Sequence, residues 1–352
     1  MPTFDMVVVG AGGGPDETNL SAYLFKPSET TWKEGLLALE AGSAQGALTK
    51  LLTHDPFLFG SPSDSQPQVY SAAEIYSFVH CFLITHAHLD HVNGLVISAG
   101  SLGGTRKRVF ATRQTLDDLE SVFSDRIWPN LASWNEGDED YKLLYSTLPT
   151  DNKYKKVYPD VSVRTIPINH GCNTAGVYQS AAFFIRHDTH NREFLFFGDV
   201  EPDTVASKPQ TIHVWRTAAS KIPQKLSTIF IECSWPSGRP DDLLYGHLNP
   251  EHLLDELMVL AAEIVKFRRG EKTGLSTRPL RKKHKRNPVS DEELRGALDG
   301  VCVYVTHCKD NMTGNFDKPM RNIIVPQVRT LVEERGLGAQ ILAAEQGMRI
   351  QI

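Results

Sequence analysis

The sequence lacks the long apolar runs that mark membrane proteins. None of its hydrophobic stretches approaches the ~20 residues that a helix needs to cross a bilayer. Its first residues also differ from a secretory signal, because Asp5 interrupts them and the apolar run Val7 to Val9 is short and leads into glycines. We therefore expect neither a membrane partner nor a leader.

Cysteine is scarce. The five cysteines are odd in number and show no CxxC spacing: Cys81, Cys172, Cys233, Cys302 and Cys308. This pattern argues against a disulfide framework and favours a reducing compartment, the cytoplasm. Cys172 and Cys308 lie close to two histidines discussed below. They are either additional metal ligands or, as we expect, small packing residues.

An excess of basic charge is missing too. The 352 residues carry a formal net charge of −5. Proteins that bind the nucleic-acid backbone normally have a basic surface patch. We therefore expect no nucleic-acid partner. Residues 268–286 are the exception, with nine Lys or Arg residues and almost no apolar side chains. They read as a solvated insertion, with a patch for an acidic partner as the alternative.

The most informative segment is the hexad His86-Ala87-His88-Leu89-Asp90-His91. It follows the apolar, β-rich run 79–85, which predicts a buried strand that ends where the hexad begins. His86 and His88 can reach one divalent ion, while Asp90 and His91 can hold a second ion nearby. Imidazole and carboxylate ligands suit zinc or a similar first-row metal. The hexad therefore predicts a metal site with two ions.

Six residues cannot saturate two ions, so further ligands are needed. Three candidates stand in the same context as the hexad, directly after a β-rich run: His170 after 161–168, Asp199 after 194–198 and His307 after 301–306. A carboxylate can bridge two ions, which is the role we expect for Asp199.

In the order of these residues the chain resembles the metallo-β-lactamase superfamily. Within it, the segment 85–99 resembles the class II cyclic nucleotide phosphodiesterases, the type of the fungal low-affinity cyclic AMP enzymes. Further similar segments are spread over nearly the whole chain: Val9-Gly10-Ala11-Gly12-Gly13-Gly14-Pro15, Phe197-Gly198-Asp199-Val200-Glu201-Pro202-Asp203, Tyr245-Gly246-His247-Leu248 and Val305-Thr306-His307-Cys308-Lys309.

The resemblance implies an α/β (α+β) fold, the αββα sandwich of the superfamily. Alternating strand-like and helix-like segments agree with it. We expect one domain over residues 1–352, with insertions at about 126–148 and 268–290. Trp128 and Trp134 in the first insertion either cover the cleft or, more in keeping with their chemistry, pack in the interior.

The implied activity is hydrolysis of 3′,5′-cyclic AMP to 5′-AMP, with cyclic GMP as an alternative substrate. One ion would be held by His86, His88 and His170, the other by Asp90, His91 and His307, with Asp199 between them. Zinc is the expected metal, with manganese and iron as alternatives, and water activated by the ions would attack phosphorus. The family also implies a homodimer.

His247 completes the expected catalytic set, which consists of Asp90, Asp199 and His247. It precedes a predicted helix in which Asn249 is the N-cap and Pro250 the first residue. Because a helix N-terminus favours anions, His247 is a candidate for protonating the leaving oxygen or contacting phosphate. A packing role in a loop is the alternative.

Other functions remain in competition with this one. A ribonuclease Z-like tRNA-processing enzyme shares the ligand order but would be expected to carry more positive charge. A β-lactamase or thioester hydrolase is disfavoured, because Asp199 stands where the commonest lactamases have a cysteine. A scaffold without activity would be expected to have lost ligands.

Overall fold

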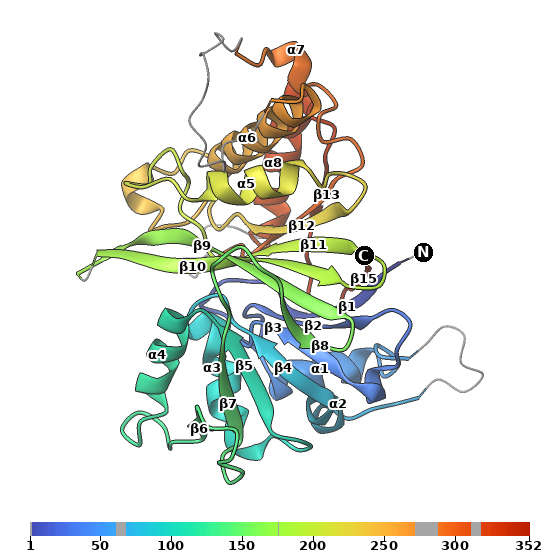
Figure 1. Cartoon of the computed structure of the whole chain (residues 1–352), viewed down its shortest axis with the longest axis vertical. Coiled ribbons are helices and arrows are strands. Elements are labelled where there is room, and N and C mark those ends of the chain that lie inside the picture. Colours follow the sequence, from blue (N-terminus) through green and yellow to red (C-terminus); the bar gives the residue numbers. More distant parts are fainter. Residues whose placement is uncertain (1, 61–67, 175, 272–287, 311–317) are drawn as a thin grey trace.

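The computed structural model describes residues 2–60, 68–174, 176–271, 288–310 and 318–352. Two β-sheets lie face to face in the middle, with one group of helices below them and another above (Figure 1). This is the expected αββα sandwich. Most of the basic segment 268–286 falls outside the described residues.

Among the described residues, the first sheet has eight strands. In spatial order they are β15 (Arg349–Gln351), β1 (Phe4–Gly10), β2 (Ala22–Pro27), β3 (Leu36–Leu39), β4 (Val79–Leu83), β5 (Lys107–Ala111), β7 (Leu143–Thr147) and β6 (Ala132–Ser133). Strand β4 runs parallel to both of its neighbours, β3 and β5.

The second sheet has seven strands in the part of the chain that the structure describes. In spatial order they are β14 (Gln340–Ala343), β13 (Cys302–Thr306), β12 (Leu226–Glu232), β11 (Arg192–Phe197), β10 (Gly176–His187), β9 (Val161–Asn173) and β8 (Lys155–Tyr158). Strands β11 to β14 are parallel, whereas β9 and β10 form a long antiparallel hairpin.

The helices divide between the outer faces. Those on the first sheet are α1 (Gln45–His54), α2 (Ala72–Phe78), α3 (Leu89–Ser98) and α4 (Arg113–Val122). Those on the second are α5 (Thr211–Ala219), α6 (Pro250–Arg268), α7 (Asp291–Leu294) and α8 (Arg321–Arg335). Short 3-10 helices span Trp32–Glu34, Ala99–Ser101 and Asp241–Leu243. None of the helices in the described residues is long and apolar enough to span a membrane.

Side-chain alternation builds the cores. In β11, Phe194 and Phe196 enter the core between the sheets, while Leu195 and Phe197 lie under the helices of the second sheet. The rings of Phe4 and Phe194 meet edge to face across the sheets, with centroids 5.3 Å apart. Both faces of the strands are covered, which is why they read as continuous apolar runs in the sequence.

Residues 126–148, where we expect an insertion, form part of the first sheet. They contribute β6 and β7, which extend the first sheet at its edge beyond β5. Trp128 and Trp134 are half-buried and pack against the core beneath this sheet, in agreement with the expected packing role.

Candidate functional site

The carboxyl ends of four strands meet at one edge of the sandwich. Strands β11, β12 and β13 are parallel neighbours, and each is followed by a polar residue of this edge. Strand β4 of the other sheet ends just before His86, which is fully buried. Ligands commonly bind outside the carboxyl ends of parallel strands, where polar loop residues converge.

The hexad is divided between a loop and a helix. Helix α3 starts early, at Leu89 inside the hexad, with His88 as its N-cap residue. Asp90 and His91 therefore lie in the first turn of α3, and His86 and His88 stand before it. One short segment thus presents ligands in two directions.

His170 also sits differently from its expected place. It lies within β9, which continues to Asn173, instead of following the strand. The pairing between β9 and β10 shifts register near this point, opposite the interval from Val177 to Gln179. Such irregularities redirect side chains, and here the imidazole faces the hexad.

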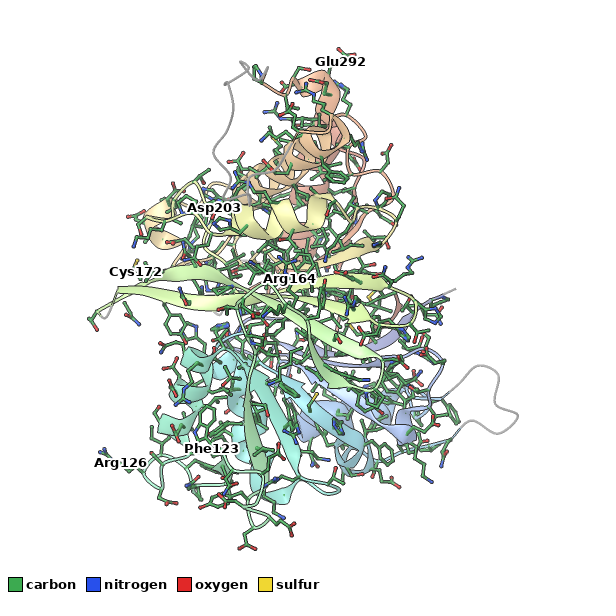
Figure 2. The ribbon with its side chains drawn as sticks, in the orientation of Figure 1. Phe123, Arg126, Arg164, Cys172, Asp203 and Glu292 are labelled. Atoms are coloured by element: carbon green, nitrogen blue, oxygen red, sulfur yellow. The ribbon has the colours of Figure 1, made fainter. Side chains whose placement is uncertain are left out.

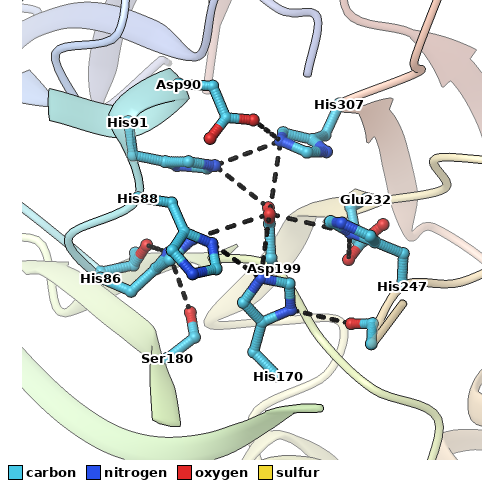
Figure 3. Close-up of polar contacts among 12 residues, drawn as sticks. His86, His88, Asp90, His91, His170, Ser180, Asp199, Glu232, His247 and His307 are labelled. Carbon is cyan, nitrogen blue, oxygen red and sulfur yellow. Dashed lines mark hydrogen bonds and ion pairs between the residues drawn. The ribbon is translucent and has the colours of Figure 1, made fainter. Parts of the chain in front are cut away.

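Asp199 lies at the centre of the site (Figure 3). Its carboxylate oxygens lie 3.3–3.7 Å from ring nitrogens of five histidines: His86, His91, His170, His247 and His307. It is 2% exposed. A single buried carboxylate thus connects all parts of the site.

Two groups of potential metal ligands share this carboxylate. The first consists of His86, His88, His170 and Asp199, and the second of Asp90, His91, Asp199 and His307. Within the first, His170 Nε2 and His88 Nδ1 are 3.1 Å apart. Within the second, His307 Nε2 is 3.1 Å from both His91 Nε2 and Asp90 Oδ2.

The distances of 3.3–3.7 Å between Asp199 and the ring nitrogens of His86, His91, His170 and His307 are close to those between two ligands of one metal ion. Tetrahedral ligand atoms at zinc, ~2.0–2.2 Å from the ion, lie roughly 3.3–3.6 Å from one another. Moreover, His86 Nε2 is buried without a hydrogen-bond partner in the described part of the chain, although buried polar atoms normally have one. A cation between these groups would satisfy it, so the residues present fit a divalent metal centre.

Further residues orient the imidazoles. His170 Nδ1 donates to the carbonyl of Gly246 at 2.8 Å, and His307 Nδ1 lies 2.9 Å from Ser234 Oγ. Thr85 Oγ1 lies 3.0 Å from His86 Nδ1. Partners on Nδ1 fix the ring plane and leave Nε2 facing the centre.

Burial and charge set the protonation of the ligands. Burial lowers the pKa of His86 and lowers that of His170 to about 3, so both rings are neutral near pH 7. Burial opposes ionisation of Asp199, but the neighbouring His307 and His91 hold its pKa well below its usual range. Neutral imidazole and ionised carboxylate are the forms that bind metals. Burial acts against protonation of His91, but Asp199 raises its pKa well above the usual value, so an ion at the second group would displace this proton.

Behind the ligands lies a carboxylate to which the sequence analysis assigned no role. Glu232 is the last residue of β12 and is 1% exposed. His247 Nδ1 donates to its Oε1 at 2.9 Å, and the Ser234 hydroxyl donates to its Oε2 at 2.6 Å. The backbone N–H of Val200 also donates to Glu232. Its place at a strand end is the signal that could have identified it.

Tyr178 of β10 is a second residue that the sequence analysis missed. Its ring stacks on His88, with centroids 4.6 Å apart and planes 2° from parallel. Burial raises the pKa of its phenol to about 12, so the ring is neutral. No ligand-like spacing pointed to it, because the long hairpin brings it to the site from a distant part of the sequence.

The two cysteines near the ligands belong to neither ligand group. Cys308 is buried, as expected of a packing residue, and burial raises the pKa of its thiol to about 12. The packing role predicted for Cys172 is wrong, because this residue is exposed on the projecting hairpin (Figure 2). The β9–β10 arm carries it away from the interior.

The glycine-rich segment after β1 approaches the centre closely. A Cβ atom on Gly13 would lie 2.2–2.4 Å from the ring of His307. Only glycine allows the backbone to pass this close to the imidazole.

The chain is similar to known phosphodiesterases over most of its length. The model of the class-II cAMP phosphodiesterases matches residues 59–347. A 3′,5′-cyclic-nucleotide phosphodiesterase of Schizosaccharomyces pombe is 34% identical over 278 residues, covering 75% of this chain and 77% of that protein.

Solved structures show the same fold. Unliganded yeast PDE1 superposes with a TM-score of 0.78 at 24% identity, covering 100% of both chains. The metallo-beta-lactamase fold protein YhfI of Bacillus subtilis reaches 0.55 at 14% identity, with 99% of each chain covered. The expected fold is confirmed, and by the match over residues 59–347 the chain belongs to the class-II cAMP phosphodiesterases.

Proposed function

We propose that this chain hydrolyses 3′,5′-cyclic AMP to 5′-AMP with two divalent metal ions, and that it accepts cyclic GMP as well. The observation that carries the proposal is the pair of four-residue ligand groups that share Asp199. Family membership supplies the substrate class.

The proposed ligands are those expected from the sequence. His86, His88 and His170 would hold one ion, Asp90, His91 and His307 would hold the other, and Asp199 would be shared by both. Imidazole and carboxylate ligands favour zinc, with manganese or iron as the alternatives. Two such ions would lower the pKa of water for the attack and offset the negative charge of the phosphodiester.

Asp90 and Asp199 serve catalysis through their negative charges, which would hold the metal ions in the site. Burial acts against ionisation of Asp90, but the hydrogen bond from His307 and the charge of His91 lower its pKa below the usual range. Both carboxylates are therefore ionised near neutral pH. Lys309 Nζ lies 3.8 Å from Asp90 Oδ2 and brings a positive charge to the same side.

His247 is the proposed acid for the leaving O3′ oxygen. Its Nδ1 is bonded to Glu232, which fixes the ring and leaves Nε2 as the atom that carries the transferable proton. This arrangement resembles a general acid oriented by a buried carboxylate. His247 is only 5% exposed, so the atoms packed around it keep the ring from rotating freely.

The substrate class is tested by one set of assays. Purified metal-loaded protein is incubated in parallel with cyclic AMP, cyclic GMP, bis(p-nitrophenyl) phosphate and precursor tRNA. We expect hydrolysis of both cyclic nucleotides, loss of activity with a chelator, and recovery with about two ions per chain. Cleavage of precursor tRNA with no action on cyclic nucleotides would overturn the proposal.

The role of His247 is tested by substitution. His247→Ala should lose about 10²–10⁴ in kcat on cyclic AMP, the usual range for general acid catalysis. The loss should be much smaller on bis(p-nitrophenyl) phosphate, because p-nitrophenolate leaves without a proton. His54→Ala, at an exposed histidine at the end of α1, is the matched control. Equal losses on both substrates would instead indicate phosphate positioning, and loss of metal would make His247 a ligand.

A further inference from the structure

Large apolar side chains are exposed beside the proposed metal centre. Leu89, 67% exposed, stands between the ligands His88 and Asp90, and Tyr245, 66% exposed, stands just before Gly246, whose carbonyl accepts from His170. Val177 and Leu243 nearby are 39% and 41% exposed. Leu89, Val177 and Tyr245 each stand next to a residue of the site in the sequence, and exposed apolar side chains at such a place commonly mark a binding surface.

Tyr245 has an unusual backbone conformation. Its φ is +54°, in the left-handed region that bulky residues rarely adopt. Such conformations persist where the surroundings fix them, and they are frequent at ligand-binding sites. The ring contributes little to the stability of the fold, because it is mostly exposed. Its described cation–π partner is Arg239, 5.8 Å from the ring centroid.

Neighbouring residues hold this turn rigid. The indole N–H of Trp235 donates to the carbonyl of Leu244 at 3.0 Å, and Arg239 Nε donates to the carbonyl of Leu243 at 2.6 Å. The guanidinium of Arg239 stacks on Trp235 at 3.6 Å. His247, two residues beyond Tyr245, bonds back to Leu244 through its backbone N–H. The exposed phenol ring therefore projects from a fixed turn that also positions His170 and His247.

We propose that Tyr245 is the platform on which the nucleobase of the substrate stacks. This inference rests on the proposed function, because the metal ions would hold the phosphate and the base lies one sugar ring away. Stacking of a base on an aromatic side chain changes affinity by about 5- to 150-fold. Every base presents a π-face, so the platform serves cyclic AMP and cyclic GMP alike.

The test compares KM and kcat of Tyr245 variants on three substrates. These are cyclic AMP, cyclic GMP and a methyl riboside 3′,5′-cyclic phosphate, which has the same reacting ring but no base. Tyr245→Ala should raise KM about 5- to 150-fold for both cyclic nucleotides with little change in kcat, as expected when binding is lost uniformly. KM for the base-free substrate should change far less. Tyr245→Phe should keep most of the affinity.

Tyr245→Gly separates binding from folding. Glycine adopts the left-handed conformation without strain, so the melting temperature should not fall, while KM for the cyclic nucleotides should rise as in the alanine variant. Phe57→Ala, at another exposed aromatic residue (48% exposed), is the matched control and should leave KM unchanged.

Several outcomes would overturn the proposal. If the wild-type protein hydrolyses cyclic AMP and Tyr245→Ala has the same KM, the platform is refuted while the proposed function stands. If KM is unchanged and the variant alters the mass in light scattering, the ring instead contacts a second copy of the chain. If the metal-loaded wild-type protein hydrolyses no cyclic nucleotide, the proposed function and the platform fall together.

Discussion

At the scale of single residues, Asp199 has the largest influence on the site. Its Oδ1 lies 3.3 Å from His91 Nε2, and its Oδ2 lies 3.6 Å from His170 Nε2. Each proposed ion would therefore lose a negatively charged ligand if this one side chain were removed. Asp203 of the same segment is engaged elsewhere, since it accepts from the backbone N–H groups at the start of α5.

The first prediction concerns this carboxylate. Asp199→Ala should lose bound metal, and its turnover should fall by several orders of magnitude. The reason is that the positive charges of the two metal ions would no longer be balanced by this carboxylate. Metal content by elemental analysis and kcat on cyclic AMP measure this. Glu201→Ala, two residues away, should retain metal. Wild-type turnover in Asp199→Ala would mean that another carboxylate bridges the ions.

At the scale of elements, helix α3 is locked to the loop after β3. The backbone N–H of Gly94 donates to Gly42 and that of Leu95 donates to Ala41, while Ala41 donates to the carbonyl of His91. A Cβ on Gly94 would lie 2.7 Å from the Cβ of Ala44 and 2.8 Å from the carbonyl oxygen of Ala41. The glycine therefore sets how closely the helix with two proposed ligands approaches the sheet.

The second prediction compares two glycines in helices. Gly94→Ala should destabilise the protein by about 1–3 kcal/mol, the usual cost of overpacking, and weaken metal binding because α3 carries Asp90 and His91. Gly46→Ala in α1 meets no atom within 4 Å and should stabilise by about 0.5–1 kcal/mol through helix propensity. Melting temperatures and metal affinity measure both. If Gly94→Ala were more stable than the wild type, the loop after β3 would be able to shift and make room for the added methyl group.

At the scale of the whole molecule, one buried carboxylate connects the segment after Asp199 to two helices. Glu256 of α6 accepts from the Trp215 indole of α5 at 2.6 Å and from the backbone N–H of Asp203 at 2.8 Å. Burial raises its pKa from 4.5 to about 7, and the charges of Asp203 and Asp255 act in the same direction. The ionisation of Glu256 therefore affects the stability of the helices that cover the second sheet.

The third prediction follows from this pKa. Between pH 4.5 and 7 the folded chain keeps a proton on Glu256 that the unfolded chain has lost, so this group makes stability fall as pH rises through that window. The full effect is about 3 kcal/mol at most. Melting temperatures at pH 5 and pH 8 should differ less in Glu256→Gln than in the wild type. An identical pH profile in the variant would assign the dependence to other groups.

The sequence by itself determined the metal ligands as candidates and the family. The hexad concentrates four ligand side chains in six residues, and His170, Asp199 and His307 each follow a recognisable β-rich run. These signals are local, because strand ends and ligand types can be read from short windows. The helix that begins at Pro250, with the side chain of Asn249 accepting from the backbone N–H of His252, was readable for the same reason.

The tertiary structure decided what depends on long-range contacts. Glu232, Tyr178 and Tyr245 carry no ligand-like spacing, and they reach the site only because β10, β12 and the turn before α6 converge on one edge. The strand path through His170 and the early start of α3 were likewise set by pairing and packing with distant segments. Local patterns identify groups capable of chemistry, whereas partners and orientation arise from residues that are far apart in the chain and adjacent only after folding.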